Sequence, residues 1–128
     1  MADKKSKVLI VEDEMGIREL LKLKLSNEGF NILEAENGKM GLEIALKEKP
    51  DLILLDIIMP IMDGISMLGE LRNDEWGKKV PVIILSNLSD AEKINEGIEK
   101  SVYDYLVKSD WEPDNVVALI RKKLVSRK

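Results

Sequence analysis

The 128-residue sequence predicts an α/β fold in which a parallel sheet carries helices on both faces. Short apolar runs alternate five times with stretches of helical periodicity, which is the pattern of repeated strand–helix units. One run, residues 52–55, is apolar throughout and ends at Asp56, as expected for a strand covered on both faces of a parallel sheet. The length suits one domain, which we expect to span residues 1–128 with its core at about 6–126.

The first half of the chain predicts three strands with two helices between them. The strands are residues 8–11, 30–35 and 52–55, and the middle one is weaker because Asn and Glu interrupt it. Gly29 is a suitable C-terminal cap for the first helix, and Pro50 ends the second because proline disfavours helical geometry in the preceding residue. The apolar residues at helical spacing are Ile17, Leu20, Leu21 and Leu25 in the first helix and Leu42, Ala45 and Leu46 in the second.

The second half of the chain predicts a helix over residues 65–72, a strand over 80–85, another helix, a strand over 102–107 and a last helix. The last helix begins at Pro113, a favourable residue in a first turn. The inward-facing residues of the three helices are expected to be Met67, Leu68 and Leu71, then Ala91, Ile94 and Ile98, then Val117, Ile120 and Leu124.

The polarity of the strands predicts their order. Residues 8–11, 52–55 and 80–85 are apolar and should be central, whereas residues 30–35 and 102–107 carry polar side chains and should be edges. With right-handed crossovers this favours the order 2-1-3-4-5, a flavodoxin-like doubly wound sheet. The winding direction then reverses between strands one and three, and open α/β sheets bind ligands in the crevice at such a point.

The composition excludes several kinds of chemistry. The chain has no cysteine and no histidine, so disulfides, thiolate metal sites, the usual zinc ligand and the usual general base are excluded. The net charge of −4 disfavours direct nucleic-acid binding. No apolar run approaches membrane-spanning length, and the start of the chain has no apolar signal core. We therefore expect a cytoplasmic protein without membrane contact.

Polar residues at the strand ends predict a phosphoryl-transfer site. Glu12 and Asp13 follow the first strand and Asp56 ends the third, so three mutually repelling carboxylates meet at the switch point. An open site with oxygen ligands alone suits Mg²⁺. Ser86 follows the fourth strand and Lys108 the fifth; each alone is an ordinary turn or surface residue, but together they complete the set. Asp56 would attack phosphorus and form an acyl phosphate.

Four motifs in this order make the chain, over residues 6–126, similar to the receiver domain of two-component response regulators. They are Val8-Leu-Ile-Val-Glu12-Asp13-Glu, then Asp51-Leu-Ile-Leu-Leu-Asp56 through Met59-Pro60 to Asp63-Gly64, then Val82-Ile-Ile-Leu-Ser86, then Asp104-Tyr105-Leu-Val-Lys108. The resemblance implies that a sensor histidine kinase or phosphotransfer protein phosphorylates Asp56. It also implies that a downstream protein binds the face made by the helix around 91–98, the strand over 102–107 and the last helix.

The resemblance also implies a role for each site residue. Asp13, Asp56 and the backbone carbonyl of Ile58 would ligate Mg²⁺, and Glu12 would hold the metal through water. Lys108 would bind the phosphoryl group, with Ser86 as the switch hydroxyl and Tyr105 as the switch aromatic. Phosphorylation would move Ser86 toward the new oxygens and turn Tyr105 inward, which is a two-state switch.

Three positions depart from the family pattern. Ser109 replaces the usual proline after the lysine, and a cis bond before serine costs about 3 kcal/mol, so we expect a trans bond or a reshaped loop there. Asn87 stands where a small residue is usual, and Ser101-Val102 replaces a usual Gly-Ala pair. Ile58 and Leu88 should flank the acyl phosphate, and because neither orients an attacking water, we expect slow self-dephosphorylation.

Two other functions remain open. A pseudo-receiver would be an interaction module without phosphorylation; the complete acidic, hydroxyl and lysine set argues against it, whereas Asn87 and Ser109 argue for it. A phosphohydrolase with an Asp nucleophile needs a second Asp two residues after the first, where this chain has Ile58. The leading interpretation is therefore a phosphoryl acceptor, not a turnover enzyme on an external substrate, acting as a monomer or a phosphorylation-dependent dimer.

Overall fold

The sheet has five parallel strands in the order β2-β1-β3-β4-β5, as the strand polarity predicted. The computed structural model describes residues 5–86, 103–107 and 112–126, with residues 86, 103–107 and 126 described by their backbone alone. The strands are β1 (Lys7–Val11), β2 (Asn31–Ala35), β3 (Leu52–Asp56), β4 (Val82–Ser86) and β5 (Tyr103–Val107). The described helices are α1 (Met15–Asn27), α2 (Gly38–Glu48), α3 (Gly64–Arg72) and α5 (Pro113–Ser126).

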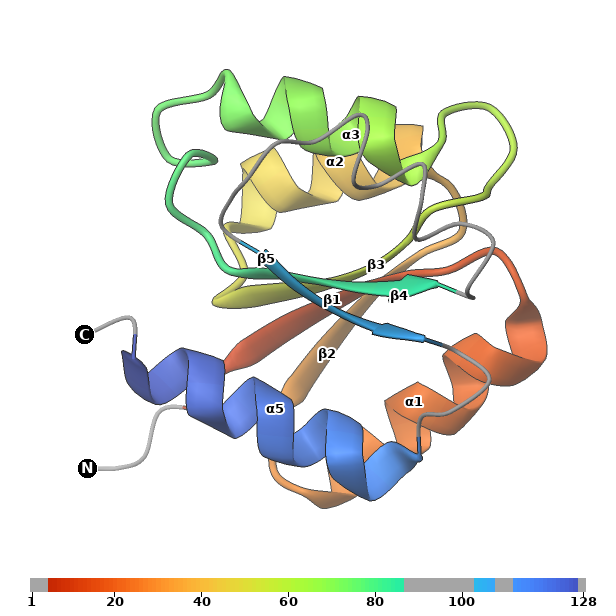
Figure 1. Ribbon diagram of the computed structural model, residues 1–128, viewed down its shortest axis with the longest axis vertical. Coiled ribbons are helices and arrows are strands. Elements are labelled where there is room, and N and C mark those ends of the chain that lie inside the picture. Colours follow the sequence, from red (N-terminus) through yellow and green to blue (C-terminus); the bar gives the residue numbers. More distant parts are fainter. Residues whose placement is uncertain (1–4, 87–102, 108–111, 127–128) are drawn as a thin grey trace.

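Helices cover both faces of the sheet, which confirms the doubly wound fold. Figure 1 shows α2 and α3 on one face and α1 and α5 on the other. The predicted helix containing Ala91, Ile94 and Ile98 lies outside the described residues. Among those that are described, no helix is both long and apolar enough to cross a membrane.

The two faces of the sheet form two apolar layers, and the central strands contribute to both. In β1, Leu9 and Val11 pack in the layer under α2 and α3, whereas Val8 and Ile10 pack in the layer with α1 and α5. The same alternation in β3 leaves every one of its residues buried. A strand enclosed in this way is apolar up to its last residue, Asp56, which is why its sequence shows no polar alternation.

The helix ends follow from local hydrogen bonding. Gly29, with φ of 96°, lets the Phe30 N–H donate to the Leu25 carbonyl (3.1 Å) and closes a Schellman motif at the end of α1. The Asn37 side chain accepts from the Met40 N–H (2.9 Å) at the start of α2. These contacts end α1 just before β2 and begin α2 just after it.

The structure corrects or refines three details of the sequence interpretation. Strand β2 begins at Asn31 and not at Phe30, because the Phe30 N–H is already used in the Schellman motif. Strand β4 begins at Val82 and not at Val80, since Pro81 has no N–H to donate to a neighbouring strand. Leu20, one of the apolar residues at helical spacing in α1, is 46% exposed because the inner face of the helix is occupied by Leu21 and Leu25.

Candidate functional site

Three carboxylates meet where β1 and β3 end. The two strands are adjacent and in register, with Val11 opposite Leu55, so the residues that follow them emerge side by side. One carboxylate oxygen each from Glu12, Asp13 and Asp56 lies within 4.8 Å of the others. The structure therefore brings together the three acidic residues that the sequence placed at the switch point.

Glu12 is held through its backbone as well as its side chain. Its N–H donates to the Ala35 carbonyl of β2 (3.0 Å), its own carbonyl accepts from Arg18 Nη1 (2.8 Å), and its Oε2 accepts from the Glu14 N–H (3.1 Å). The residue is fully buried, whereas the neighbouring Asp13 is exposed. Glu12 is therefore the buried member of the acidic cluster, and hydrogen bonds hold it in place.

Asp56 is the last residue of β3 and is 4% exposed. Its Oδ1 accepts from the N–H of Ile57 (2.9 Å), a contact that sets the rotation of the carboxylate. The chain returns close to Asp56 at Gly64, whose N–H donates to the Ile57 carbonyl (2.8 Å). A Cβ at Gly64 would lie only 2.1 Å from the Asp56 carbonyl oxygen, so this approach requires glycine.

The loop between β3 and α3 is also tied to α2. The Gly38 N–H donates to the Met62 carbonyl (3.0 Å), and a Cβ at Gly38 would lie 2.3 Å from that oxygen. Within the loop, the Met62 N–H donates to the Pro60 carbonyl (2.7 Å) across Ile61, whose φ is 68°, which is a γ-turn. Ile58, whose carbonyl the sequence predicts as a metal ligand, belongs to this loop and exposes 54% of its surface.

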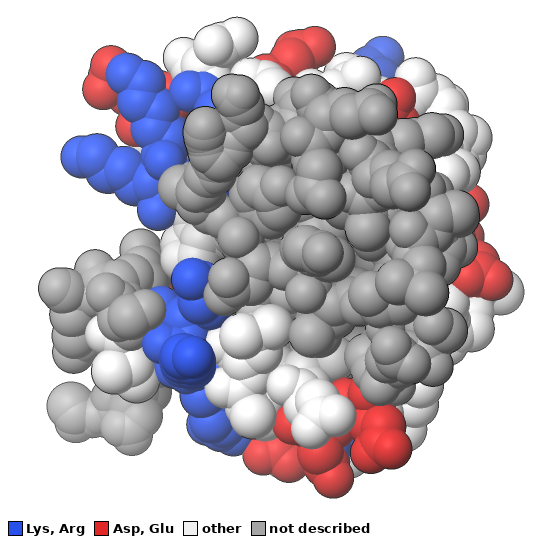
Figure 2. All heavy atoms as spheres, in the orientation of Figure 1, with Lys and Arg blue, Asp and Glu red and all other residues white. Residues whose placement is uncertain are grey.

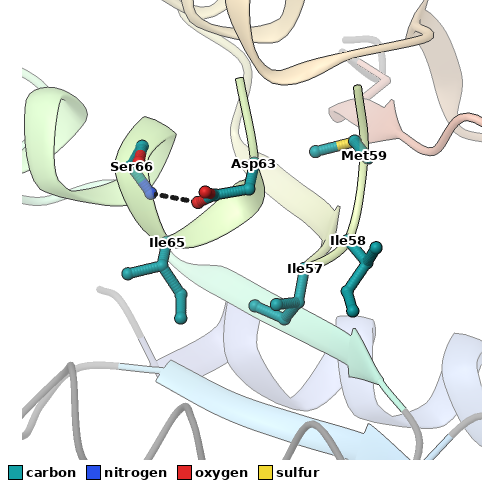
Figure 3. A pocket seen from close by; sticks show the side chains of 6 residues that line it. All are labelled: Ile57, Ile58, Met59, Asp63, Ile65 and Ser66. Carbon is teal, nitrogen blue, oxygen red and sulfur yellow. Dashed lines mark hydrogen bonds between the residues drawn. The ribbon is translucent and has the colours of Figure 1, made fainter. Parts of the chain in front are cut away.

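An apolar pocket of about 330 Å³ lies beside the same loop. Figure 3 shows the side chains of Ile57, Ile58 and Ile65 pointing to one side of it, while Asp63 accepts a hydrogen bond from the Ser66 N–H (2.7 Å) and caps α3. None of the three clustered carboxylates lines this pocket. The acidic cluster and the apolar pocket are therefore neighbouring features that share the loop after Asp56. The lining residues are Ile57, Ile58, Met59, Asp63, Ile65 and Ser66.

Of the remaining predicted site residues, Ser86 and Tyr105 are described by their backbone alone, and Lys108 lies outside the described residues. Ser86 ends β4 one residue beyond Leu85, which pairs with Asp56, so its backbone reaches the same edge of the sheet. Strand β5 ends at Val107, opposite Ser86 and one residue before Lys108. The predictions made on Asn87, Leu88, Ser101, Val102 and Ser109 also fall on residues outside the described part of the structure.

Arg18 is a residue of the site that the sequence interpretation missed. It contacts the Glu12 carbonyl and also pairs with Glu34 of β2, with 3.3 Å between Nε and Oε1. Lys22, one turn further along α1, pairs with the other Glu34 oxygen at 3.0 Å, and this hydrogen bond raises the pKa of the lysine. The only signal in the sequence was an arginine in the first turns of a helix that follows an acidic cluster.

A family model for the response regulator receiver domain matches residues 8–121. The chain belongs to this family. Response regulators work with histidine kinases in two-component systems, and their receiver domains are signalling modules and not classical enzymes. This confirms the resemblance and the general function that the four motifs implied.

Individual relatives agree with the family match. A probable transcriptional regulator, ycf27, from Porphyridium aerugineum is 38% identical over 120 residues, which cover 94% of this chain and 48% of the relative. The receiver domain of the Francisella response regulator 1452 is 32% identical with a TM-score of 0.85, covering 97% of this chain and 100% of that one. The chain spans about half the length of the curated relatives it matches, so its extent as a single domain stays a prediction.

A third comparison concerns the metal. The receiver domain of the sensor histidine kinase PA1611 from Pseudomonas aeruginosa, solved with magnesium coordinated in its active-site cleft, has a TM-score of 0.84. The match covers 94% of this chain and 98% of that one, and at 24% identity it shows the fold alone. In this chain, Glu12, Asp13 and Asp56 offer oxygen donors only, a set that fits a hard divalent cation of the kind that receiver domains bind in their acidic pocket.

Proposed function

We propose that Asp56 accepts a phosphoryl group from the phosphohistidine of a sensor histidine kinase or phosphotransfer protein. One observation carries this proposal: a nearly buried carboxylate ends β3 with an oxygen within 4.8 Å of oxygens from Glu12 and Asp13. Holding three like charges together, two of them buried, is unfavourable unless a cation or a reaction uses them. The cluster is therefore better explained as a working site than as part of the folding core.

The residues that would hold Mg²⁺ are Asp13, Asp56 and the backbone carbonyl of Ile58, with Glu12 acting through a water molecule. The bound ion would offset negative charge on the transferring phosphoryl group and on the carboxylates. Because the Ile57 N–H fixes the rotation of the Asp56 carboxylate, the nucleophile is oriented before the phosphoryl group arrives.

In the transfer, an Asp56 carboxylate oxygen forms a bond to phosphorus while the bond from phosphorus to the histidine nitrogen breaks. The electron pair of the broken bond stays on the imidazole, which leaves as neutral histidine after taking up a proton. The Ser86 hydroxyl and the Lys108 ammonium group would contact the phosphoryl oxygens and stabilise the negative charge that develops on them. The product is an acyl phosphate on the protein itself.

The proposed output is a change in protein binding. The added phosphoryl charge would draw in Ser86 and turn Tyr105 inward, altering the face formed by the helix around residues 91–98, β5 and α5. A downstream protein or a second copy of the chain would bind this face. We further propose a cytoplasmic location and slow self-dephosphorylation. We also propose that this chain itself does not bind nucleic acid directly; curated relatives named as transcriptional regulators extend beyond the matched region.

Phosphorylation by acetyl phosphate with Mg²⁺, followed by intact-protein mass spectrometry, tests the proposal. The wild-type chain should gain the mass of one phosphoryl group, and Asp56→Asn should gain none. Asp51→Asn is a matched control, since Asp51 stands just before the opposite end of β3 and accepts from the Lys7 N–H. It should still be phosphorylated.

Two outcomes would point elsewhere. A wild-type chain that stays unmodified, under conditions in which another receiver is labelled, would favour the non-phosphorylated pseudo-receiver. Continuous release of phosphate, many times the amount of protein, would instead favour the phosphohydrolase.

A further inference from the structure

Arg18 of α1 joins two strands beside the acidic cluster. Its Nη1 donates to the Glu12 carbonyl at 2.8 Å, and its Nε lies 3.3 Å from Glu34 Oε1 of β2. Only 14% of the Arg18 side chain is exposed. The guanidinium therefore lies between the point where β1 ends and the neighbouring edge strand, in a fork geometry that a flexible ammonium group does not reproduce.

The contact with the Glu12 carbonyl bears directly on the direction of Asp13. That carbonyl belongs to the same planar peptide unit as the Asp13 N–H, so holding its oxygen fixes the plane from which Asp13 starts. The Glu12 N–H is already bound to the Ala35 carbonyl at 3.0 Å. Together the two bonds fix the backbone of Glu12 on both sides, and with it the directions of two of the three carboxylates.

We propose that Arg18 is a positioning residue for the divalent-cation site. By binding the Glu12 carbonyl while Glu34 holds the guanidinium, it keeps Glu12 and Asp13 aimed at Asp56 before the cation arrives. This inference rests on the proposed function, because it assumes that the acidic cluster binds a cation.

Removing Arg18 should change cation affinity in one direction if its charge matters most, and in the opposite direction if its positioning role does. A guanidinium beside the cluster repels a cation, so deleting its charge should by itself tighten cation binding. Loss of positioning should weaken binding, because the carboxylates would have to be ordered by the cation itself. The sign of the change therefore separates the two explanations.

Lys22 provides a matched control for the charge. It pairs with the same Glu34 carboxylate at 3.0 Å, and no contact with Glu12 is among its described interactions. Lys22→Met removes one positive charge from this region, as Arg18→Met does, but leaves the Glu12 carbonyl bound. Arg18→Lys keeps the positive charge but loses the planar guanidinium that contacts both Glu12 and Glu34, so it tests geometry alone.

The experiment titrates each purified, unphosphorylated chain with Mn²⁺ and measures the free ion by electron paramagnetic resonance, with Mg²⁺ affinity obtained by competition. Arg18→Met should weaken binding about 10-fold, the lower end of the effect of removing a partner that orients a metal ligand. Arg18→Lys should also weaken it, and Lys22→Met should leave it unchanged or slightly tighter. Urea unfolding in EDTA shows that each variant is folded, and Arg18→Lys serves if Arg18→Met is not.

The outcomes distinguish this inference from the function on which it rests. If the wild-type chain binds Mn²⁺ and Asp13→Asn abolishes binding, but Arg18→Met and Arg18→Lys bind as well as wild type or better, Arg18 has no positioning role and the proposed function stands. If the wild-type chain itself binds no Mn²⁺ or Mg²⁺ at millimolar concentration, both proposals are wrong.

Discussion

At the scale of single residues, Ile61 combines a strained backbone conformation with a largely exposed side chain. Lys49 and Ile61 are the non-glycine residues with positive φ in the described part of the chain, and Lys49 ends α2, where this conformation is common. Ile61 is β-branched, has φ of 68° and exposes 76% of its surface. The γ-turn conformation, with its positive φ, is strained and costs a non-glycine residue about 1–3 kcal/mol, and such strain collects at functional loops.

Replacing Ile61 should therefore stabilise the protein. Glycine has no Cβ to be strained at positive φ, so Ile61→Gly is expected to raise the free energy of unfolding by about 1 kcal/mol. The measurement is urea denaturation of the metal-free protein. Ile61→Ala removes the same exposed apolar surface but keeps a Cβ, so it should gain less; an equal gain in both variants would attribute the effect to lost apolar exposure and not to strain.

Ile58 should control the lifetime of the acyl phosphate. It stands two residues after Asp56 with an exposed apolar side chain, which cannot hydrogen-bond to an attacking water. Ile58→Asn supplies such a group and is expected to shorten the phosphate half-life several-fold, measured on phosphorylated protein after removal of the donor. Ile61→Asn makes the same change three residues further along the loop and should have little effect. Similar half-lives for wild type and Ile58→Asn would refute the idea.

At the scale of elements, the loop between β3 and α3 is shaped by two backbone contacts that leave no room for a side chain. Gly38 meets the Met62 carbonyl and Gly64 meets the Asp56 carbonyl. These contacts join α2, the loop and the start of α3 into one unit around the end of β3. The sequence shows both glycines, but it cannot show that their neighbours are carbonyl oxygens from other segments of the chain.

Two substitutions in the same helix test this arrangement. In Gly64→Ala the added methyl would meet the Asp56 carbonyl at 2.1 Å, so the loop must move; we expect a loss of about 1–3 kcal/mol of stability and slower phosphorylation. Gly69 is exposed in α3 with no atom within 4 Å of an added Cβ. Gly69→Ala should instead gain about 0.5–1 kcal/mol by helix propensity. Equal effects of the two changes in chemical denaturation would contradict the close-approach argument.

At the scale of the whole molecule, the sheet order and the meeting of Glu12, Asp13 and Asp56 could be predicted because both depend on short-range patterns. Strand polarity separates central from edge positions, and parallel strands place their carboxyl ends at one edge. The role of Arg18 could not be predicted, since its two contacts join residues 6 and 16 positions away through the packing of α1 on the sheet. The exact starts of β2 and β4 were missed because the Phe30 N–H is used in the Schellman motif and Pro81 has no N–H to give to a neighbouring strand.

An ion pair also connects α1 to α5. Figure 2 shows basic side chains on the left, where α5 ends, and acidic side chains at the lower edge, where it begins. Near that beginning, Lys24 lies 2.6 Å from Asp114, and this hydrogen bond is the main cause that raises the pKa of Lys24 above its ordinary 10.5. A raised lysine pKa means stabilisation that is present below the ordinary value and lost as pH rises through the folded one.

Lys24→Gln should therefore reduce stability slightly near neutral pH, where the ion pair is exposed and screened. The difference from wild type should shrink as pH rises above 10.5 and through the raised pKa of the folded chain, where the lysine loses its charge. Chemical denaturation across this range measures it. A difference that stays constant with pH would assign the effect to packing of the lysine stem.

The acidic cluster should make the stability of the whole domain depend on the cation. In Asp13→Asn, the difference in unfolding free energy from wild type should change sign between metal-free and Mg²⁺-containing solution. Without metal, removing one of three carboxylates whose oxygens lie within 4.8 Å relieves repulsion of about 1 kcal/mol, so the variant should be more stable than wild type in EDTA. With Mg²⁺ at 100 times its dissociation constant, wild type should gain about 2.7 kcal/mol and the variant little, so the order reverses. Glu36→Gln, which removes an exposed charge after β2, should show no reversal in thermal unfolding. If Asp13→Asn is destabilised in EDTA, or gains as much from Mg²⁺ as wild type, Asp13 is not a member of the cation site.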